Sequence, residues 1–205
     1  MIANFHNNEY TLFIKNLPIN QPLYNDEVVL MYYSKSKDLY PGMGSGERIS
    51  EERKEEFEEL SKISNWRKML SNFYIQPFTF NKLTWNSVEH LYQGSKFKKN
   101  NPEFYKLFAI ESGSDISKNP EIAKAAGGKS GKYKGKMIRV KNIVMDDDFF
   151  DGDNNIMFRA LYAKFSQNKD LLDVLKKTRD AKLIHFMRGH PYMAMTDLMK
   201  VRQAL

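Results

Sequence analysis

The pattern of apolar and polar positions predicts short strands at the start of the chain and mainly helices after them. Apolar, aromatic and β-branched residues gather at residues 10–14 and 28–33, as is typical of strands. Residues 73–80 alternate with a period of two, and Asn81 and Lys82 suit a tight turn into residues 83–85. We therefore expect a small hairpin in this region.

Helical spacing dominates the remainder. Ser50 is placed to cap a charged helix that buries Phe57 and Leu60. Further helices are predicted from about 87 to 98, from residue 102, over 120–127, 157–165 and 171–175, and over 193–205, with a short buried strand at 182–187. No repeat or linker interrupts the chain. The sequence thus predicts the α+β class, as a single helix-rich domain over residues 1–205 with a small sheet and a hairpin.

Composition narrows the class of protein. The chain has no cysteine, which excludes disulfides, Cys-ligated zinc and a Cys nucleophile and suits a reducing compartment. It has no apolar run long enough to span a membrane, and its first residues do not show the basic and then apolar pattern of a signal peptide. We therefore expect an intracellular, cytoplasmic protein without a membrane partner. The formal charge of +7 fits either simple solubility or an anionic partner such as phosphate, nucleotide or nucleic acid.

One helix face carries an unusual polar row. Glu89, Gln93 and Lys96 are spaced i, i+4, i+7 and share a face, with Trp85 just before the helix, where it can roof a cleft. Because such groups are costly to bury, this face meets either solvent or a polar cleft. A second interpretation is purely structural: with Asn86 as N-cap, Glu89 is the N3 residue of a capping box, and spacing alone favours it.

Familiar catalytic and metal motifs are missing from the sequence. His90 has no second His or carboxylate at helical ligand spacing, so we interpret it as a structural histidine and expect no metal. The sequence contains no GxGxxG, Walker or GxSxG motif, and we expect no cofactor.

Several strings resemble the NADAR family, which includes the bacterial YbiA proteins. They are LSNFY at 70–74, TWNSVEHLYQGSKF at 84–97, AKFSQN at 163–168 and DLMKVR at 197–202. Residues 33–47 are similar to the start of many members, so the resemblance covers roughly residues 30–205. Its most specific part is W-x-x-V-E-H-x-x-Q-x-x-K-F. The resemblance implies a YbiA-like fold.

The resemblance also implies an N-glycosidase reaction, with two candidate substrates. One is an early riboflavin intermediate such as 5-amino-6-(5-phosphoribosylamino)uracil, which would release ribose 5-phosphate; the other is ADP-ribose linked to guanine in nucleic acid. In both, water replaces nitrogen at C1′ of a phosphorylated ribose. A third possibility is a non-enzymatic module that binds ADP-ribose or nucleic acid, with Glu89 serving only as a cap.

Roles follow from that chemistry. Cleavage at C1′ develops positive charge on the sugar, so Glu89 is the candidate to stabilise it or to activate water. Lys96 suits a proton donor, a covalent amine or a phosphate contact, and these roles stay open. The predicted substrate-binding residues in the matching motifs are Ser71, Asn72, Phe73, Trp85 and Gln93; Phe73 and Trp85 would stack on the base, although Phe73 is equally a core strand residue.

Two Gly-rich loops are candidates for phosphate. Backbone amides of the loop Gly42–Gly46, which includes Gly44, can form an anion-binding nest. The lysines of the loop at 127–136 can act as point charges, or can simply be solvated. Asp180 matches a family position and is a candidate catalytic residue. A Glu and a Trp-Gly pair that many members have nearby are missing, and the region holds Arg188, a further candidate for substrate binding.

Overall fold

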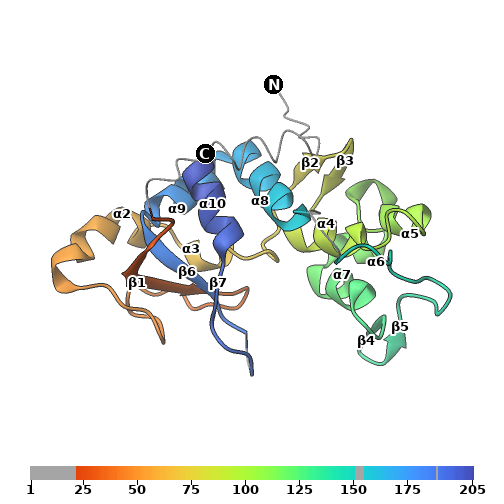
Figure 1. The fold of residues 1–205 in the computed structure, drawn as a ribbon, viewed down its shortest axis with the longest axis horizontal. Helices are drawn as coiled ribbons and strands as arrows, with labels where there is room; N and C mark the ends of the chain where they lie inside the picture. The colour runs from red at the N-terminus through yellow and green to blue at the C-terminus, as the bar shows by residue number, and fades with distance from the viewer. Residues whose placement is uncertain (1–21, 151–154, 188) are drawn as a thin grey trace. The chain divides into compact units, whose positions relative to one another are not determined.

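The computed structural model describes residues 22–150, 155–187 and 189–205, which form two compact units (Figure 1). Among the described residues, unit 1 contains residues 75–167, and unit 2 contains residues 22–74 and 168–205. Each unit mixes helices with small sheets, which confirms the predicted α+β class. The strand predicted at residues 10–14 lies outside the described residues. The expectation of one domain stays a prediction.

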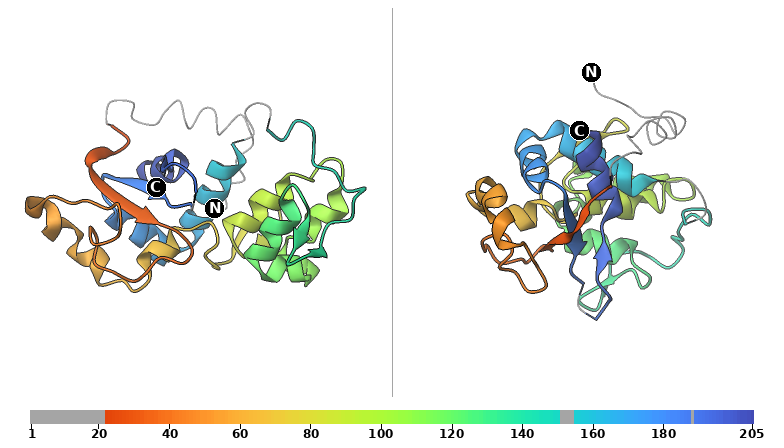
Figure 2. Two further views of the ribbon diagram at one scale, coloured as in Figure 1. Left: turned by 90° about the horizontal axis from the view of Figure 1, so that it is seen from below. Right: turned by 60° about the vertical axis from the view of Figure 1, so that its left-hand side comes forward.

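Unit 2 is built on a three-stranded sheet of order β1-β6-β7, formed by β1 (Asn25–Tyr32), β6 (Ala181–His185) and β7 (Met193–Ala194). Strands β1 and β6 are parallel, with Tyr32 opposite His185, and lie side by side in Figure 2. Strand β7 pairs antiparallel with β6. Because parallel strands end at one edge, the residues that follow Tyr32 and His185 are brought together there.

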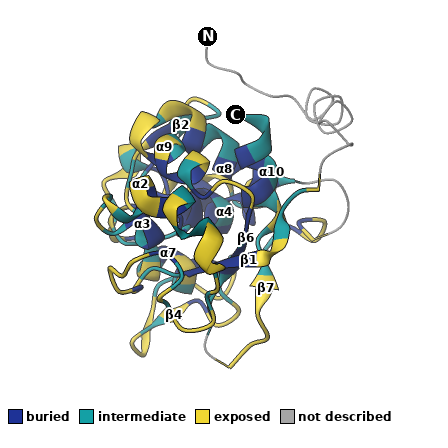
Figure 3. Cartoon of the chain, turned by 90° about the vertical axis from the view of Figure 1, so that its left-hand side faces the viewer, coloured by how far each residue is buried: buried dark blue, intermediate teal, exposed yellow. Residues whose placement is uncertain are grey.

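Helices of unit 2 pack against this sheet, and the last five residues of β1 are all buried. The helices of the unit are η1 (Glu51–Phe57), α2 (Glu58–Ser61), α3 (Trp66–Met69), α9 (Lys169–Lys177) and α10 (Thr196–Ala204). Phe57 and Leu60 are fully buried, as predicted. The charged segment begins as a 3₁₀ helix, however, and the Ser50 side chain makes no capping hydrogen bond. Figure 3 shows the buried residues of β1 and β6 and the exposed start of β7.

Unit 1 begins with the predicted hairpin of β2 (Phe78–Phe80) and β3 (Leu83–Trp85). Asn81 and Lys82 have φ of 52° and 64°, the left-handed conformation of a two-residue hairpin turn. The strand is shorter than the 73–80 we expected from the alternation. The backbone of residues 71–77 instead forms a turn followed by chain without regular secondary structure.

Helices make up most of unit 1. They are α4 (Val88–Ser95), α5 (Pro102–Lys106), η2 (Ile110–Ser112), α6 (Asp115–Lys118), α7 (Pro120–Gly127) and α8 (Ile156–Gln167). Helix α4 packs against both α7 and α8 and so forms the centre of the unit. The Gly/Lys-rich segment is not only a loop, because β4 (Lys132–Tyr133) and β5 (Lys136–Met137) pair as a small antiparallel hairpin.

Candidate functional site

The first turn of α4 is capped by Ser87, one residue later than predicted. Ser87 has extended backbone, and its Oγ accepts the amide of His90 at 3.4 Å and lies 2.7 Å from His90 Nδ1. Asn86 instead donates its side-chain amide to Ser117 O at 2.8 Å. Glu89 is therefore the N2 residue, and its recorded bond is to Gln93 and not to the cap. The capping-box interpretation of Glu89 was wrong.

The polar row of α4 is buried. Glu89, Gln93 and Lys96 are 6%, 7% and 8% exposed. Gln93 Nε2 donates to Glu89 Oε1 at 2.9 Å, and Lys96 Nζ donates to the backbone O of Gly127 at 3.2 Å. The sequence left open whether this face meets solvent. It does not, because all three side chains are buried; Gln93 Oε1 has no hydrogen-bond partner among the described residues.

Burial shifts the acid and the amine of this row toward their neutral forms. Burial raises the pKa of Glu89, while the Gln93 hydrogen bond and the charges of Lys124 and Lys96 act to lower it. Burial also lowers the pKa of Lys96; Glu89 opposes this shift and Arg139 adds to it. The pKa of the carboxyl group is thus raised and the pKa of the ammonium group is lowered, the directions expected of groups that transfer protons in an active site.

The carboxyl end of α7 packs against this row at Gly127. A Cβ on Gly127 would lie 2.2 Å from Gln93 Oε1, so only glycine lets the two helices approach this closely. Arg139 fixes the helix end, because its guanidinium donates to the O atoms of Ala126 (2.9 Å) and Gly128 (3.0 Å). A cation at this position also complements the negative end of the helix dipole.

Aromatic rings border the row on its lysine side, a feature that we did not predict. Lys96 Nζ lies 5.2 Å from the ring centroid of Tyr92 and 5.8 Å from that of Phe150. Phe149 packs edge-on against Tyr92 at 5.6 Å. The amide of Asp146 donates to Lys96 O at 2.7 Å, which ties this segment to the end of α4. The adjacent Phe149 and Phe150 were the only sequence signal.

Trp85 belongs to the core of unit 1. It has no exposed surface, its Nε1 donates to Phe80 O at 3.1 Å, and its ring packs against Tyr105 at 5.3 Å. A ring covered on all sides offers no face to a base. In this structure Trp85 therefore stabilises the hairpin that leads into α4, and it does not roof a cleft as we expected.

The residues of the LSNFY motif lie in unit 2, in the turn after α3. Ser71 is buried, and its Oγ accepts the amide of Phe73 at 3.2 Å. Asn72 and Phe73 are half-buried. Phe73 lies outside any strand, which removes the strand alternative. Their predicted role in substrate binding stays a prediction.

Asp180 immediately precedes β6 and is held by an ion pair. Its Oδ1 lies 2.6 Å from Arg53 Nη2, and its side chain is 47% exposed. Burial would raise the pKa of Asp180, but the hydrogen bonds and charge of Arg53 outweigh it and keep this pKa below its usual value. The pair anchors η1 to the start of β6. A catalytic role for Asp180 stays a prediction, and Arg188 lies outside the described residues.

The nest in the first Gly-rich loop already contains an anion, the carboxylate of Glu47. Glu47 Oε2 accepts the amides of Gly42 (3.0 Å) and Gly44 (2.9 Å), and Oε1 accepts the amide of Met31 (3.0 Å). Arg67 also binds both carboxylate oxygens, at 2.9 and 2.6 Å. Our expectation that these loop amides are available to phosphate was therefore wrong for Gly42 and Gly44. Gly46 is not part of this set; its φ of +81° shapes the loop.

Within the described residues, no group of three or more His, Asp or Glu side chains is arranged to hold a metal ion. None of the helices in those parts of the chain has the length and apolar character needed to cross a membrane.

The buried row of Glu89, Gln93 and Lys96 on α4 belongs to the motif that resembles the NADAR family. The family model of the NADAR domain matches residues 48–190, more than half of the chain, so the chain belongs to the NADAR family. The NMR structure of the E. coli protein YbiA is similar in fold, with a TM-score of 0.52 and 20% identity, covering 89% of this chain and 91% of that one. No curated protein matches. Membership of this family, which includes N-glycosidases, supports a glycosidase-like role in general terms.

Proposed function

We propose that this protein is an N-glycosidase that hydrolyses the C1′–N bond of a phosphorylated ribosylamine, such as 5-amino-6-(5-phosphoribosylamino)uracil, and releases ribose 5-phosphate. The observation that carries this proposal is the state of Glu89, a carboxyl group that is almost completely buried and aligned by a neighbouring amide. A surface acid or a helix cap would show neither property.

One oxygen of Glu89 is fixed and the other is available. Gln93 holds Oε1, and no hydrogen bond to Oε2 is recorded within the parts of the chain that the structure describes. As the C1′–N bond lengthens, positive charge develops on the ribose ring, and a nearby carboxylate stabilises it. Oε2 then accepts a proton from the water whose oxygen forms the new bond to C1′.

Lys96 supplies the proton that the leaving nitrogen needs. Since burial lowers the pKa of Lys96, its ammonium group is a stronger acid than an ordinary lysine. The electron pair of the broken bond goes to nitrogen, which takes the proton from Nζ. Transfer of the proton that Glu89 gained back to Lys96 restores both groups.

Glu89→Gln tests this proposal, because it removes the charge and keeps an acceptor for Gln93. We expect release of ribose 5-phosphate to fall by about 10²- to 10⁴-fold, as for loss of a general base. Glu103→Gln is the matched control: it is also a first-turn helix acid of unit 1, but its side chain is 83% exposed. A Glu89→Gln variant with full turnover would show that another group is the catalytic acid or base.

The pH dependence provides a second test of Glu89. Its pKa is raised above the ordinary value of 4.5, so the group takes up its proton at a higher pH than a solvated glutamate. The acid limb of kcat for the wild type should therefore lie above pH 4.5 and should disappear in Glu89→Gln. An acid limb at the same pH in the wild type and in Glu89→Gln would contradict the assignment of Glu89 as the group that must lose its proton.

A second candidate, removal of ADP-ribose from guanine in nucleic acid, is supported by the charge of the β4–β5 region. Residues 122–145 include Lys and Arg but no Asp or Glu. The lysines of the 127–136 segment, for which the sequence left open phosphate contact or simple solvation, are all exposed: Lys129, Lys132, Lys134 and Lys136. Release of ADP-ribose from a modified oligonucleotide, with affinity that falls steeply with salt, supports this substrate. An oligonucleotide left intact rejects it.

A further inference from the structure

We propose that Arg139 is a positioning residue for Lys96: its guanidinium holds the end of α7, where the Gly127 carbonyl receives the Lys96 ammonium, and keeps a second positive charge beside that ammonium. All three residues belong to unit 1. Lys96 thereby has a fixed place and remains a ready proton donor. This catalytic consequence rests on the function proposed above, whereas the effect of Arg139 on Lys96 can be measured without any substrate.

Three successive carbonyl groups at the carboxyl end of α7 bind the two cations. Arg139 Nη1 donates to Ala126 O at 2.9 Å and to Gly128 O at 3.0 Å. The carbonyl between them, that of Gly127, accepts from Lys96 Nζ at 3.2 Å. The last carbonyls of a helix lack intrahelical partners and carry partial negative charge, which stabilises a nearby ammonium. Arg139 takes the acceptors on either side of the one that holds Lys96.

The β4–β5 hairpin carries Arg139 to this place. Strand β5 ends shortly before Arg139, and the amides of Ile138 and Arg139 both donate to Gly131 O, at 2.9 and 3.1 Å. Gly131 has a φ of +63°, and a Cβ there would lie 3.0 Å from Arg139 Cβ, so glycine lets the two arms of the hairpin approach closely. The guanidinium also donates to Lys129 O at 3.2 Å and lies 5.2 Å from the ring centroid of the buried Phe97. These contacts fix its position.

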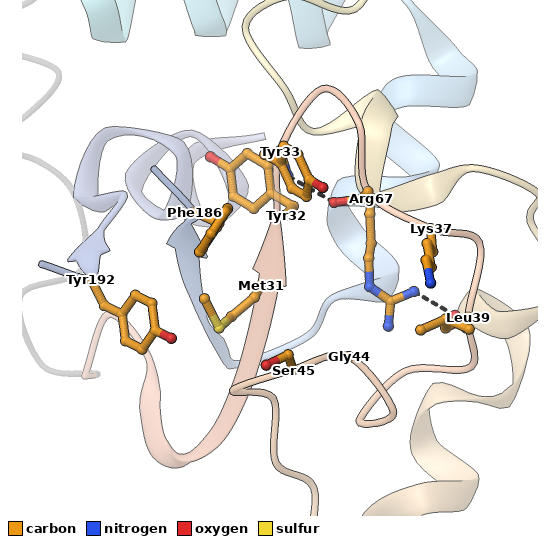
Figure 4. A pocket seen from close by; sticks show the side chains of 11 residues that line it. Met31, Tyr32, Tyr33, Lys37, Leu39, Gly44, Ser45, Arg67, Phe186 and Tyr192 are labelled. Atoms are coloured by element: carbon orange, nitrogen blue, oxygen red, sulfur yellow. Dashed lines mark hydrogen bonds between the residues drawn. The ribbon is translucent and has the colours of Figure 1, made fainter. Parts of the chain in front are cut away.

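The charge of Arg139 is not compensated by an acid. Arg67 of unit 2 also binds backbone carbonyls, those of Leu39 and Tyr40, and Figure 4 shows its bond to Leu39. The Glu47 carboxylate compensates the charge of Arg67. In the parts of the chain that the structure describes, Arg139 binds carbonyl oxygens and forms no ion pair. Its full positive charge therefore acts on the groups around it.

The pKa of Lys96 depends on few charges. Burial lowers this pKa, Glu89 acts to raise it and Arg139 acts to lower it. Tyr92, whose ring borders the ammonium, stays neutral because burial raises its own pKa. The other charged groups on the elements around α4 act on different partners: Lys124 on Glu89, Lys164 on His90, Asp146 and Asp148 on Lys99, and Glu103 on Lys106. Loss of the Arg139 charge should therefore raise the pKa of Lys96.

An NMR titration of the full-length protein with isotope-labelled lysine side chains tests the proposal. The Lys96 signal is identified by its loss in Lys96→Met. In Arg139→Gln, the titration midpoint of Lys96 should move to higher pH by about 1 pH unit, because a like charge is removed and helix carbonyls are released. Arg139→Lys restores the charge and should reverse most of that shift. Lys132→Gln removes an exposed charge of the same hairpin, so this matched control should leave the midpoint unchanged.

Two results would overturn the proposal. One is a midpoint that Arg139→Gln leaves in place. The other is an equal shift in Arg139→Lys, because loosening of the structure, and not loss of the charge, would then explain the effect. An upward shift in Arg139→Gln that Arg139→Lys reverses supports the proposal, whether or not any substrate is turned over.

Kinetics then test the catalytic consequence. Since Lys96 must be protonated to act, activity is lost as pH rises through its pKa. In Arg139→Gln the basic limb of kcat for release of ribose 5-phosphate should move to higher pH together with the NMR midpoint, and kcat should fall about tenfold because the donor is a weaker acid. A basic limb that stays in place while the midpoint moves would overturn the catalytic role of this positioning. A wild type that shows the expected midpoint but releases no ribose 5-phosphate contradicts only the glycosidase.

Discussion

Arg67 and Glu47 form an ion pair inside unit 2, and its disruption should be among the most damaging single changes there. The two side chains are 4% and 0% exposed. Arg67 also donates to the backbone O atoms of Leu39 and Tyr40, so one guanidinium holds the loop by both charge and hydrogen bonds. Arg67→Met keeps much of the side-chain volume and leaves the Glu47 carboxylate buried without a counter-charge.

The expected loss follows from that burial. Removal of one partner of a buried pair costs about 3–5 kcal/mol, because the remaining charge is uncompensated. With an m-value of about 2 kcal/mol/M, the urea midpoint of unit 2 should fall by about 2 M. Adding Glu47→Gln to Arg67→Met should recover part of this loss, since it removes the charge and keeps an acceptor for the amides of Gly42 and Gly44.

Tryptophan fluorescence can follow unit 2 separately. The chain has two tryptophans, and Trp66 lies beside Arg67, with the guanidinium 4.1 Å from its ring centroid. In a Trp85→Phe background, Trp66 reports the unfolding of unit 2. Lys54→Met is the control, because it breaks an exposed pair with Glu51 and should cost at most about 1 kcal/mol. Equal midpoint shifts for Arg67→Met and Lys54→Met would refute this reasoning, as would no recovery in the double variant.

Three further predictions concern unit 1, and the first uses Ser50 of unit 2 as its control. Ser87→Ala removes a capping hydrogen bond and should lower the free energy of unfolding by about 0.5–2 kcal/mol in urea titrations. Ser50→Ala removes no such bond, so the free energy of unfolding should change by less than about 0.5 kcal/mol. Equal losses in the two variants would contradict the assigned caps. Gly127→Ala should cost about 1–3 kcal/mol by the same assay through its clash with Gln93, and Gln93→Ala should relieve most of it; no relief would place the strain elsewhere. Burial lowers the pKa of His90 to about 4, so the unfolded chain binds more protons between pH 4 and 6.5, and stability should fall as pH drops through this range; an NMR titration of His90 near 6.5 would refute this.

Several features that depend on neighbouring residues were predicted correctly. Asn119 and Pro120 open α7 and Gly127 ends it, as expected from capping preferences. The turn at Asn81 and Lys82 and the shared face of the α4 row follow equally from local pattern. Backbone conformation at these positions is set by the residues themselves, so distant parts of the chain do not alter it.

Features that depend on residues far apart in the chain were not predicted. Asn86 has the chemistry of an N-cap, but its amide is drawn to Ser117, and Ser87 takes the capping position. The Gly-rich loop has the composition of a phosphate nest, but Glu47 occupies its amides because Arg67 brings a counter-charge. Periodicity indicates which apolar side chains leave water, since that depends on hydrophobicity along one element. Which groups they then meet depends on contacts between elements far apart in the chain, and only the folded structure brings those together.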